Sequence, residues 1–139
     1  SCPTLIRRIE DMKMQQPRKS RCKITRGLVV RSPWIEKILH GEKTWEIRGR
    51  NTKIRGLIGL IKSGSGQVVG TCELKDVIEI FTLKDMQKSP KKHRIPLKNL
   101  KRLPYKHTFA WVIANARPLK KPIPYKHPRG AVIWVKLTS

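Results

Sequence analysis

The C-terminal stretch from residue 86 to residue 139 contains fourteen lysines and arginines and not one aspartate or glutamate. It cannot neutralise itself with internal ion pairs, so any fold that includes it must present cations to water or to an external polyanion. The whole chain of 139 residues has 32 basic and 9 acidic side chains, which gives a formal net charge of +23. This excess on an otherwise foldable chain favours a nucleic-acid partner over a basic surface that only serves solubility.

Other features argue against membranes, secretion and metal sites. We expect no membrane partner, because no apolar run could span a bilayer and the basic segment 5–16 has no Trp or Phe to insert. The basic N-terminus has no apolar stretch typical of a secretory signal. Three cysteines without a C-x-x-C pair indicate free thiols in a reducing, cytoplasmic setting. The four histidines lack metal-site spacing, so the sequence implies no firm cofactor.

Periodicity divides the chain into an arm and a domain. Residues 1–26 predict a basic arm with a short amphipathic helix over 4–16 and a polar linker. Residues 27–139 predict one α+β domain, a small mixed β-barrel of about six strands with its main helix at 33–40. Ser32 is the expected N-cap of that helix, with Pro33 at its first position, and Gly41 ends it. The expected strands cover residues 27–30, 44–48, 56–61, 67–81, 109–114 and 131–135. Residues 88–106 predict a long loop with one turn near 97–100.

A family resemblance lies in the segment 33–48, which contains G-x-K-x-x-x-x-R as Gly41, Lys43 and Arg48. Segments 61–66, 70–74 and 124–134 follow it in the matching order. Together they resemble the ASCH domain, a family of the PUA-like superfamily, over about residues 27–139. The resemblance implies a PUA-like barrel, a cleft between barrel and helix, and RNA binding. Family members are also linked to RNA cleavage and to hydrolysis of N4-acetylcytidine, so the resemblance does not fix one function.

Three residues are the catalytic candidates: Lys43, Glu46 and Glu73. Lys43 can hold a phosphate or act as a base if burial lowers its pKa. Glu46 shares one strand face with Arg48, and Lys43 can join them only if the backbone is still turning there. Glu73 is an acid among apolar residues. Two carboxylates could share a proton or hold a divalent ion in a ribonuclease, but a structural network of ion pairs is an equal alternative.

Glu46 also argues against one enzyme of the family. The amidohydrolase branch implies a Thr three residues after the Lys, and this chain has Glu46 there. A carboxylate cannot serve as the hydroxyl nucleophile. If the protein is an enzyme, a ribonuclease is therefore favoured over an amidohydrolase.

The RNA-binding candidates combine cations, small polar residues and aromatic rings. Trp34 starts the helix beside the implied cleft and is the best residue to stack on a base, whereas Trp45, Trp111 and Trp134 are expected in the core. The tetrapeptide P-Y-K-H occurs at 104–107 and 124–127, either as RNA-contacting turns or as loop anchors. The full candidate set is Trp34, Lys43, Arg48, Arg50, Lys62, Ser63, Tyr125, His127 and Arg129.

The sequence thus favours an RNA-binding module that holds single-stranded RNA or a nucleotide in a cleft flanked by basic surface. The alternative is a hydrolase, either a ribonuclease or an amidohydrolase for nucleoside derivatives such as N4-acetylcytidine. A third possibility is a basic module that binds a partner protein, although no feature identifies one.

Overall fold

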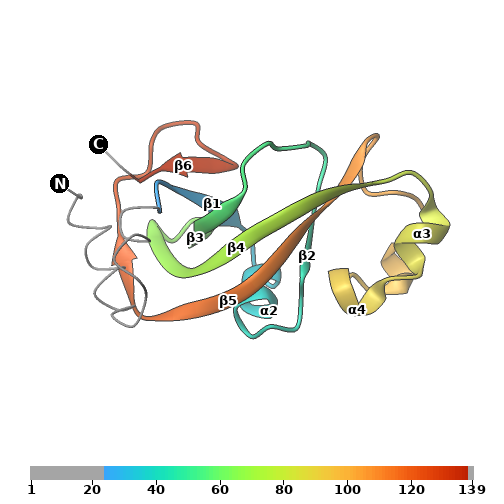
Figure 1. Cartoon of the computed structure of the whole chain (residues 1–139), viewed down its shortest axis with the longest axis horizontal. Coiled ribbons are helices and arrows are strands. Elements are labelled where there is room, and N and C mark those ends of the chain that lie inside the picture. The colour runs from blue at the N-terminus through green and yellow to red at the C-terminus, as the bar shows by residue number, and fades with distance from the viewer. Residues whose placement is uncertain (1–23, 138–139) are drawn as a thin grey trace.

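The computed structural model describes residues 24–137, in which one sheet forms the body of the molecule (Figure 1). Its strands are β1 (Arg26–Val30), β2 (Trp45–Arg48), β3 (Gly56–Lys62), β4 (Gln67–Ile80), β5 (Thr108–Pro124) and β6 (Trp134–Lys136). The helices are α2 (Trp34–Leu39), α3 (Leu83–Gln87), α4 (Pro90–His93) and the 3-10 turn η2 (Leu97–Asn99). No helix in this part of the chain is long and apolar enough to cross a membrane. The helix predicted over 4–16 lies outside the described residues.

The six strands form a mixed sheet in the order β2-β5-β4-β3-β1-β6. Strands β1 and β3 pair in parallel and the other neighbours are antiparallel. The predicted strand number is therefore confirmed, but the predicted closed barrel is not observed, because β2 and β6 stay at opposite edges. The physical reason is local: the Val29 amide at the end of β1 still donates to the Ile133 carbonyl, but the Val29 carbonyl accepts from the Arg48 side chain of β2. Within residues 24–137, β1 and β2 are thus linked by a side chain and not by backbone pairing.

Helix α2 matches the predicted helix to within one residue at each end. Ser32 is not its N-cap, because Pro33 holds that position and the Ser32 hydroxyl donates instead to Glu36 Oε2 at 2.8 Å. Ile35 and Ile38 are buried in the cluster that joins the helix to the sheet. Gly41 then adopts a left-handed φ of 79°, which a glycine tolerates and which turns the chain toward β2.

Of the three tryptophans expected in the core, Trp111 is buried there, whereas Trp45 and Trp134 are half-buried and pack against the core. Trp111 is 1 % exposed and Trp134 stacks on it, with ring centroids 5.7 Å apart. Trp45 and Ile47 pack into a separate cluster at the end of the sheet that α3 covers. Because side chains alternate along a strand, this places Glu46 and Arg48 of β2 on the opposite face.

Two segments differ from the expected structure. The loop predicted over 88–106 contains α4 as well as the expected turn η2, and it lies beside β2 (Figure 1). Strand β5 continues from Ala114 to Pro124, although its sequence no longer alternates there. This extension pairs with β4 across two bulges, with Thr71 opposite Arg117 and Val68 opposite Ile123. Strand β6 begins at Trp134, three residues later than expected.

Candidate functional site

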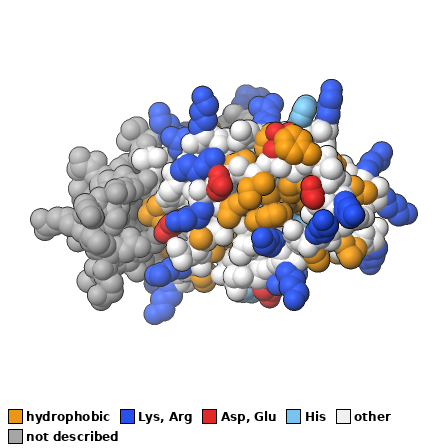
Figure 2. Space-filling view, turned by 45° about the vertical axis from the view of Figure 1, so that its right-hand side comes forward, with side chains coloured by type: hydrophobic (Ala, Val, Ile, Leu, Met, Phe, Trp, Pro, Cys, Tyr) orange, Lys and Arg blue, Asp and Glu red, His pale blue; other side chains and the backbone are white. Residues whose placement is uncertain are grey.

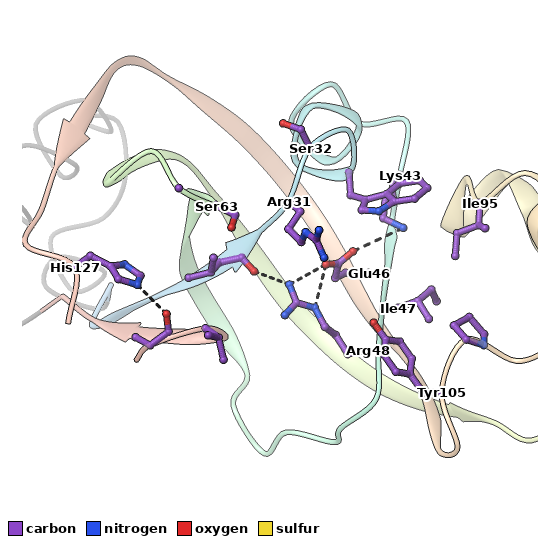
Figure 3. A pocket seen from close by; sticks show the side chains of 16 residues that line it. Arg31, Ser32, Lys43, Glu46, Ile47, Arg48, Ser63, Ile95, Tyr105 and His127 are labelled. Atoms are coloured by element: carbon purple, nitrogen blue, oxygen red, sulfur yellow. Dashed lines mark hydrogen bonds and ion pairs between the residues drawn. The ribbon is translucent and has the colours of Figure 1, made fainter. Parts of the chain in front are cut away.

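A cavity of about 740 Å³ opens beside β2, between the end of β1 and the segment that precedes β5. Figure 3 shows Lys43, Glu46 and Arg48 close together in the cavity, with His127 at its other end. The lining residues are Val29, Arg31, Ser32, Trp34, Lys43, Glu46, Ile47, Arg48, Ser63, Gly64, Ile95, Pro104, Tyr105, His127, Ala131 and Val132.

Lys43 reaches the cavity from a turn. The amides of Glu42 and Lys43 both donate to the carbonyl of Lys37, so the chain is still turning at this point. The lysine side chain is 1 % exposed, and its Nζ lies 3.8 Å from Glu46 Oε1. The ammonium also donates to the His93 carbonyl at 2.5 Å and lies 4.8 Å from the centroid of the Trp34 ring. The geometric condition for joining Lys43 to Glu46 is therefore met.

Burial sets the protonation chemistry of Lys43. Desolvation lowers the pKa of its ammonium from 10.5 to about 8, because water no longer solvates the charge. The carboxylate of Glu46 opposes this effect, and the positive charges of Arg48 and Lys37 add to it. At neutral pH the side chain is thus a cation that releases its proton far more readily than a solvated lysine.

Glu46 and Arg48 form a close pair on the same strand face. Glu46 Oε2 accepts from Arg48 Nε at 3.0 Å and from Nη2 at 2.9 Å. Arg48 Nη2 also donates to the Val29 carbonyl at 2.6 Å, and the guanidinium carbon lies 5.7 Å from the centroid of the Trp111 ring. We call Lys43, Glu46 and Arg48 the triad. In it, the buried carboxylate of Glu46 lies between two cations, Lys43 and Arg48.

Glu73 does not line this cavity. Its Oε2 lies 3.4 Å from Lys75 Nζ, and its Oε1 accepts from Asn115 Nδ2 at 3.2 Å. Two carboxylates therefore do not converge on the cavity, and no group of three or more His, Cys, Asp or Glu side chains suited to a metal occurs among residues 24–137.

Four of the predicted RNA-binding residues line the cavity together with Lys43, namely Trp34, Arg48, Ser63 and His127. His127 is fixed by two hydrogen bonds of 2.7 Å. Its Nε2 donates to the Ala131 carbonyl, so its Nδ1 accepts from the hydroxyl of Tyr125. Tyr125 thus supports the cavity through His127 without lining it, and burial raises the pKa of its phenol.

The remaining predicted residues lie outside the cavity. Lys62 Nζ is 3.4 Å from Glu36 Oε2, just before the lining turn at Ser63. Arg50 is exposed, and its carbonyl accepts from Trp111 Nε1 at 2.9 Å. Arg129 is exposed in the turn before Gly130.

Sequence reasoning missed the segment 92–95, which holds the far side of the triad in place. The Lys92 carbonyl accepts from the Thr44 amide, and Arg94 Nε donates to the Glu42 carbonyl at 2.7 Å. His93 is fully buried between them. Its Nδ1 accepts from the Ile95 amide at 2.9 Å, so its Nε2 carries the proton and donates to the Met86 carbonyl.

Burial lowers the pKa of His93, which favours this neutral tautomer. No sequence pattern distinguished His93 from the cations around it. Arg31, which was not among the candidates, lines the cavity as an exposed side chain directly after β1. Tyr105 was considered only as part of a repeated tetrapeptide, yet it lines the cavity too.

Comparisons with known proteins agree with this architecture. The family model for the ASCH domain matches residues 28–123. Among solved structures, an ASCH protein from Zymomonas mobilis superimposes with a TM-score of 0.62 at 13% identity, over 81% of this chain and 86% of that chain. Two variants of that protein give TM-scores of 0.62 and 0.61 at 13% identity, over 81% of this chain and 88% and 87% of theirs. The comparison with curated proteins gives no match. Because the family model covers most of the chain, this protein belongs to the ASCH domain family.

Proposed function

We propose that this protein binds single-stranded RNA, with one nucleotide in the cavity and the neighbouring phosphates on the basic surface. The observation that carries the proposal is the cavity itself, in which the cations Arg31, Lys43 and Arg48 meet the aromatic rings of Trp34 and Tyr105. ASCH domains are a PUA-like family often linked to RNA binding, which supports the same ligand class. Unpaired nucleotides are recognised by this combination of stacking surfaces and positive charge.

The charges within the site suggest how a nucleotide would lie. Glu46 repels phosphate, while its Oε1 faces Lys43 at 3.8 Å and offers an acceptor beside a donor. Ring and exocyclic groups of a base present the same adjacent donor and acceptor on their edges. The base therefore belongs at the triad, and the phosphates belong on exposed cations outside it. Figure 2 shows many lysine and arginine side chains on the surface and only a few acidic ones among them.

Salt dependence tests this proposal. If about five phosphates of a single strand are neutralised, a log–log plot of affinity against salt should have a slope near −3.5, roughly a hundredfold loss from 50 to 200 mM. Fluorescence anisotropy with a labelled oligoribonucleotide measures this slope. Arg31→Gln should make the slope shallower by about 0.7, since one cation at the cavity is lost.

Lys75→Gln is the matched control, because that ammonium is already paired with Glu73 at 3.4 Å. An affinity that does not change with salt, or a complete absence of complex at physiological ionic strength, would overturn the proposal.

A hydrolase is the second candidate, and Lys43 is the observation in its favour. A buried amine with a pKa of about 8 can take up and release protons near neutral pH, as a general acid or base must. The position of Glu73 outside the cavity removes support for a mechanism with two carboxylates and a metal. Incubation of labelled RNA with and without EDTA tests the ribonuclease, and incubation with N4-acetylcytidine tests the amidohydrolase. Intact substrate in every sample would exclude both.

A further inference from the structure

Tyr105 is a half-exposed aromatic ring on the wall of the cavity. It is 45% exposed and follows Pro104, another lining residue, in the segment that leads into β5. Figure 3 places its ring near the triad, with Ile47 and Ile95 on the same side of the cavity, and away from Ser63 and His127. An exposed tyrosine can be an incidental surface residue, so its local support decides what it can do.

The backbone of Tyr105 is fixed by one buried hydroxyl. Thr108 is 1 % exposed, and its Oγ1 accepts from the Tyr105 amide at 3.3 Å. The same Oγ1 donates to the Tyr105 carbonyl at 2.9 Å. Both polar groups of the tyrosine backbone are thus tied to the first residue of β5, which pairs with β4.

The ring of Tyr105 is fixed against a glycine. A Cβ placed on Gly49 would lie 2.8 Å from Tyr105 Cδ1 and 3.0 Å from Cγ, closer than side chains pack. Only a glycine therefore leaves room for the ring in this position. Gly49 directly follows Arg48, and the next carbonyl, that of Arg50, is held by Trp111 Nε1. The ring position is thereby coupled to β2, the strand that carries Glu46 and Arg48.

The ring of Trp34, the residue that the sequence favoured for stacking, already faces the Lys43 ammonium at 4.8 Å. We propose that Tyr105 is instead the base-stacking residue of the cavity, and that Gly49 is its positioning residue. This inference rests on the proposed RNA-binding function and specifies how the base is held. A ring already held in one orientation loses little freedom when a base stacks on it, so its open surface is available for binding at low entropic cost. Stacking on an aromatic ring tolerates every base, because each base has a π-face. The triad then contacts the edge of the stacked base.

Three substitutions test the stacking role. Tyr105→Ala should weaken binding of a single-stranded oligoribonucleotide by roughly 5- to 150-fold, whereas Tyr105→Phe should stay within about twofold of the parent. The salt slope of Tyr105→Ala should be unchanged, because no charge is lost. Phe81→Ala is the matched control, since Phe81 is 74% exposed and does not line the cavity. Gly49→Ala should weaken binding by displacing the ring. Circular dichroism and thermal unfolding confirm that each variant is folded.

Base-deleted oligonucleotides give a direct readout. An abasic site is moved along the strand, and affinity is measured for the parent and for Tyr105→Ala. At the stacked position, base removal should weaken the parent strongly and the variant hardly at all. If the parent binds RNA and Tyr105→Ala binds equally well, or if base removal affects both proteins equally at every position, the stacking inference is wrong. If the parent binds no RNA, the proposed function itself has failed.

Discussion

Replacing Arg48 with methionine is expected to lower the free energy of unfolding by about 3 kcal/mol at neutral pH, because it strands a buried carboxylate. The Glu46 side chain is 7% exposed and loses both hydrogen bonds that Arg48 donates to its Oε2. The Val29 carbonyl loses its guanidinium donor as well. Lys43 remains 3.8 Å from the carboxylate, which places the effect at the lower end for a broken buried pair. Urea unfolding of the two proteins measures the difference.

A second substitution separates lost packing from the stranded charge. Glu46→Gln introduced into the Arg48→Met background should recover part of the lost stability, because the stranded carboxylate is gone. The recovery is incomplete because Lys43 loses its partner carboxylate in the same step. Lys75→Met breaks the exposed Lys75–Glu73 pair and should cost less than about 1 kcal/mol. Equal losses of stability in Arg48→Met and Lys75→Met would contradict this prediction, as would no recovery in the double variant. Either result would show that the buried ion pair of the triad stabilises the fold no more than an exposed pair does.

The triad could be predicted because it is local. Lys43, Glu46 and Arg48 lie within six consecutive residues, and strand alternation placed Glu46 and Arg48 on one face. Whether Lys43 joins them depended on a turn at that residue, which the sequence left open and the structure shows. Helix α2 and strands β2, β3 and β4 could also be predicted from local sequence. Helix α2 and strand β2 have a hydrophobic period, and β3 and β4 are apolar β-rich runs joined by a glycine-containing turn. Gly41 was particularly informative, because its left-handed φ ends α2 and directs Lys43 into the cavity.

The far wall of the cavity could not be predicted, because it depends on contacts between distant parts of the chain. His93 accepts from Lys43 across fifty positions, and Arg94 reaches Glu42 across fifty-two. Helix α4 has no hydrophobic period and is held by these contacts. Glu73 lies beside a bulge between Thr71 and Glu73, and a bulge changes which face the following side chains occupy. Alternation alone therefore could not decide whether Glu73 faces the cavity.

The barrel prediction failed for a related reason. Strand count and order of segments do not state whether the two edge strands meet. Here the edge of β1 beyond Leu28 receives the Arg48 side chain, so the residue that completes the triad also occupies the gap between β1 and β2. The open edge and the cavity are thus parts of the same arrangement.

Lys43→Met is expected to change how stability depends on pH. The folded-state pKa of Lys43 is lowered from 10.5 to about 8, so between these values the unfolded chain binds more protons than the folded one. Raising the pH through this window therefore stabilises the parent, and the variant lacks this gain. Between pH 8 and pH 10.5, the free energy of unfolding of the parent should rise by about 3 kcal/mol relative to that of Lys43→Met, since each pKa unit corresponds to about 1.4 kcal/mol.

Urea unfolding of both proteins at constant ionic strength across this pH range measures the difference, in which the titration of all other groups cancels. Lys37→Met, which removes a half-exposed lysine of α2, controls for the loss of one positive charge beside the same site. Below pH 8 the buried ammonium destabilises the fold, so the stability of Lys43→Met relative to the parent should be highest there. The RNA affinity of this variant should nevertheless fall. A difference between parent and variant that stays constant with pH would contradict the burial of a charged Lys43. The same desolvation that costs stability is what strengthens the interaction of this ammonium with a ligand, because no water competes for it.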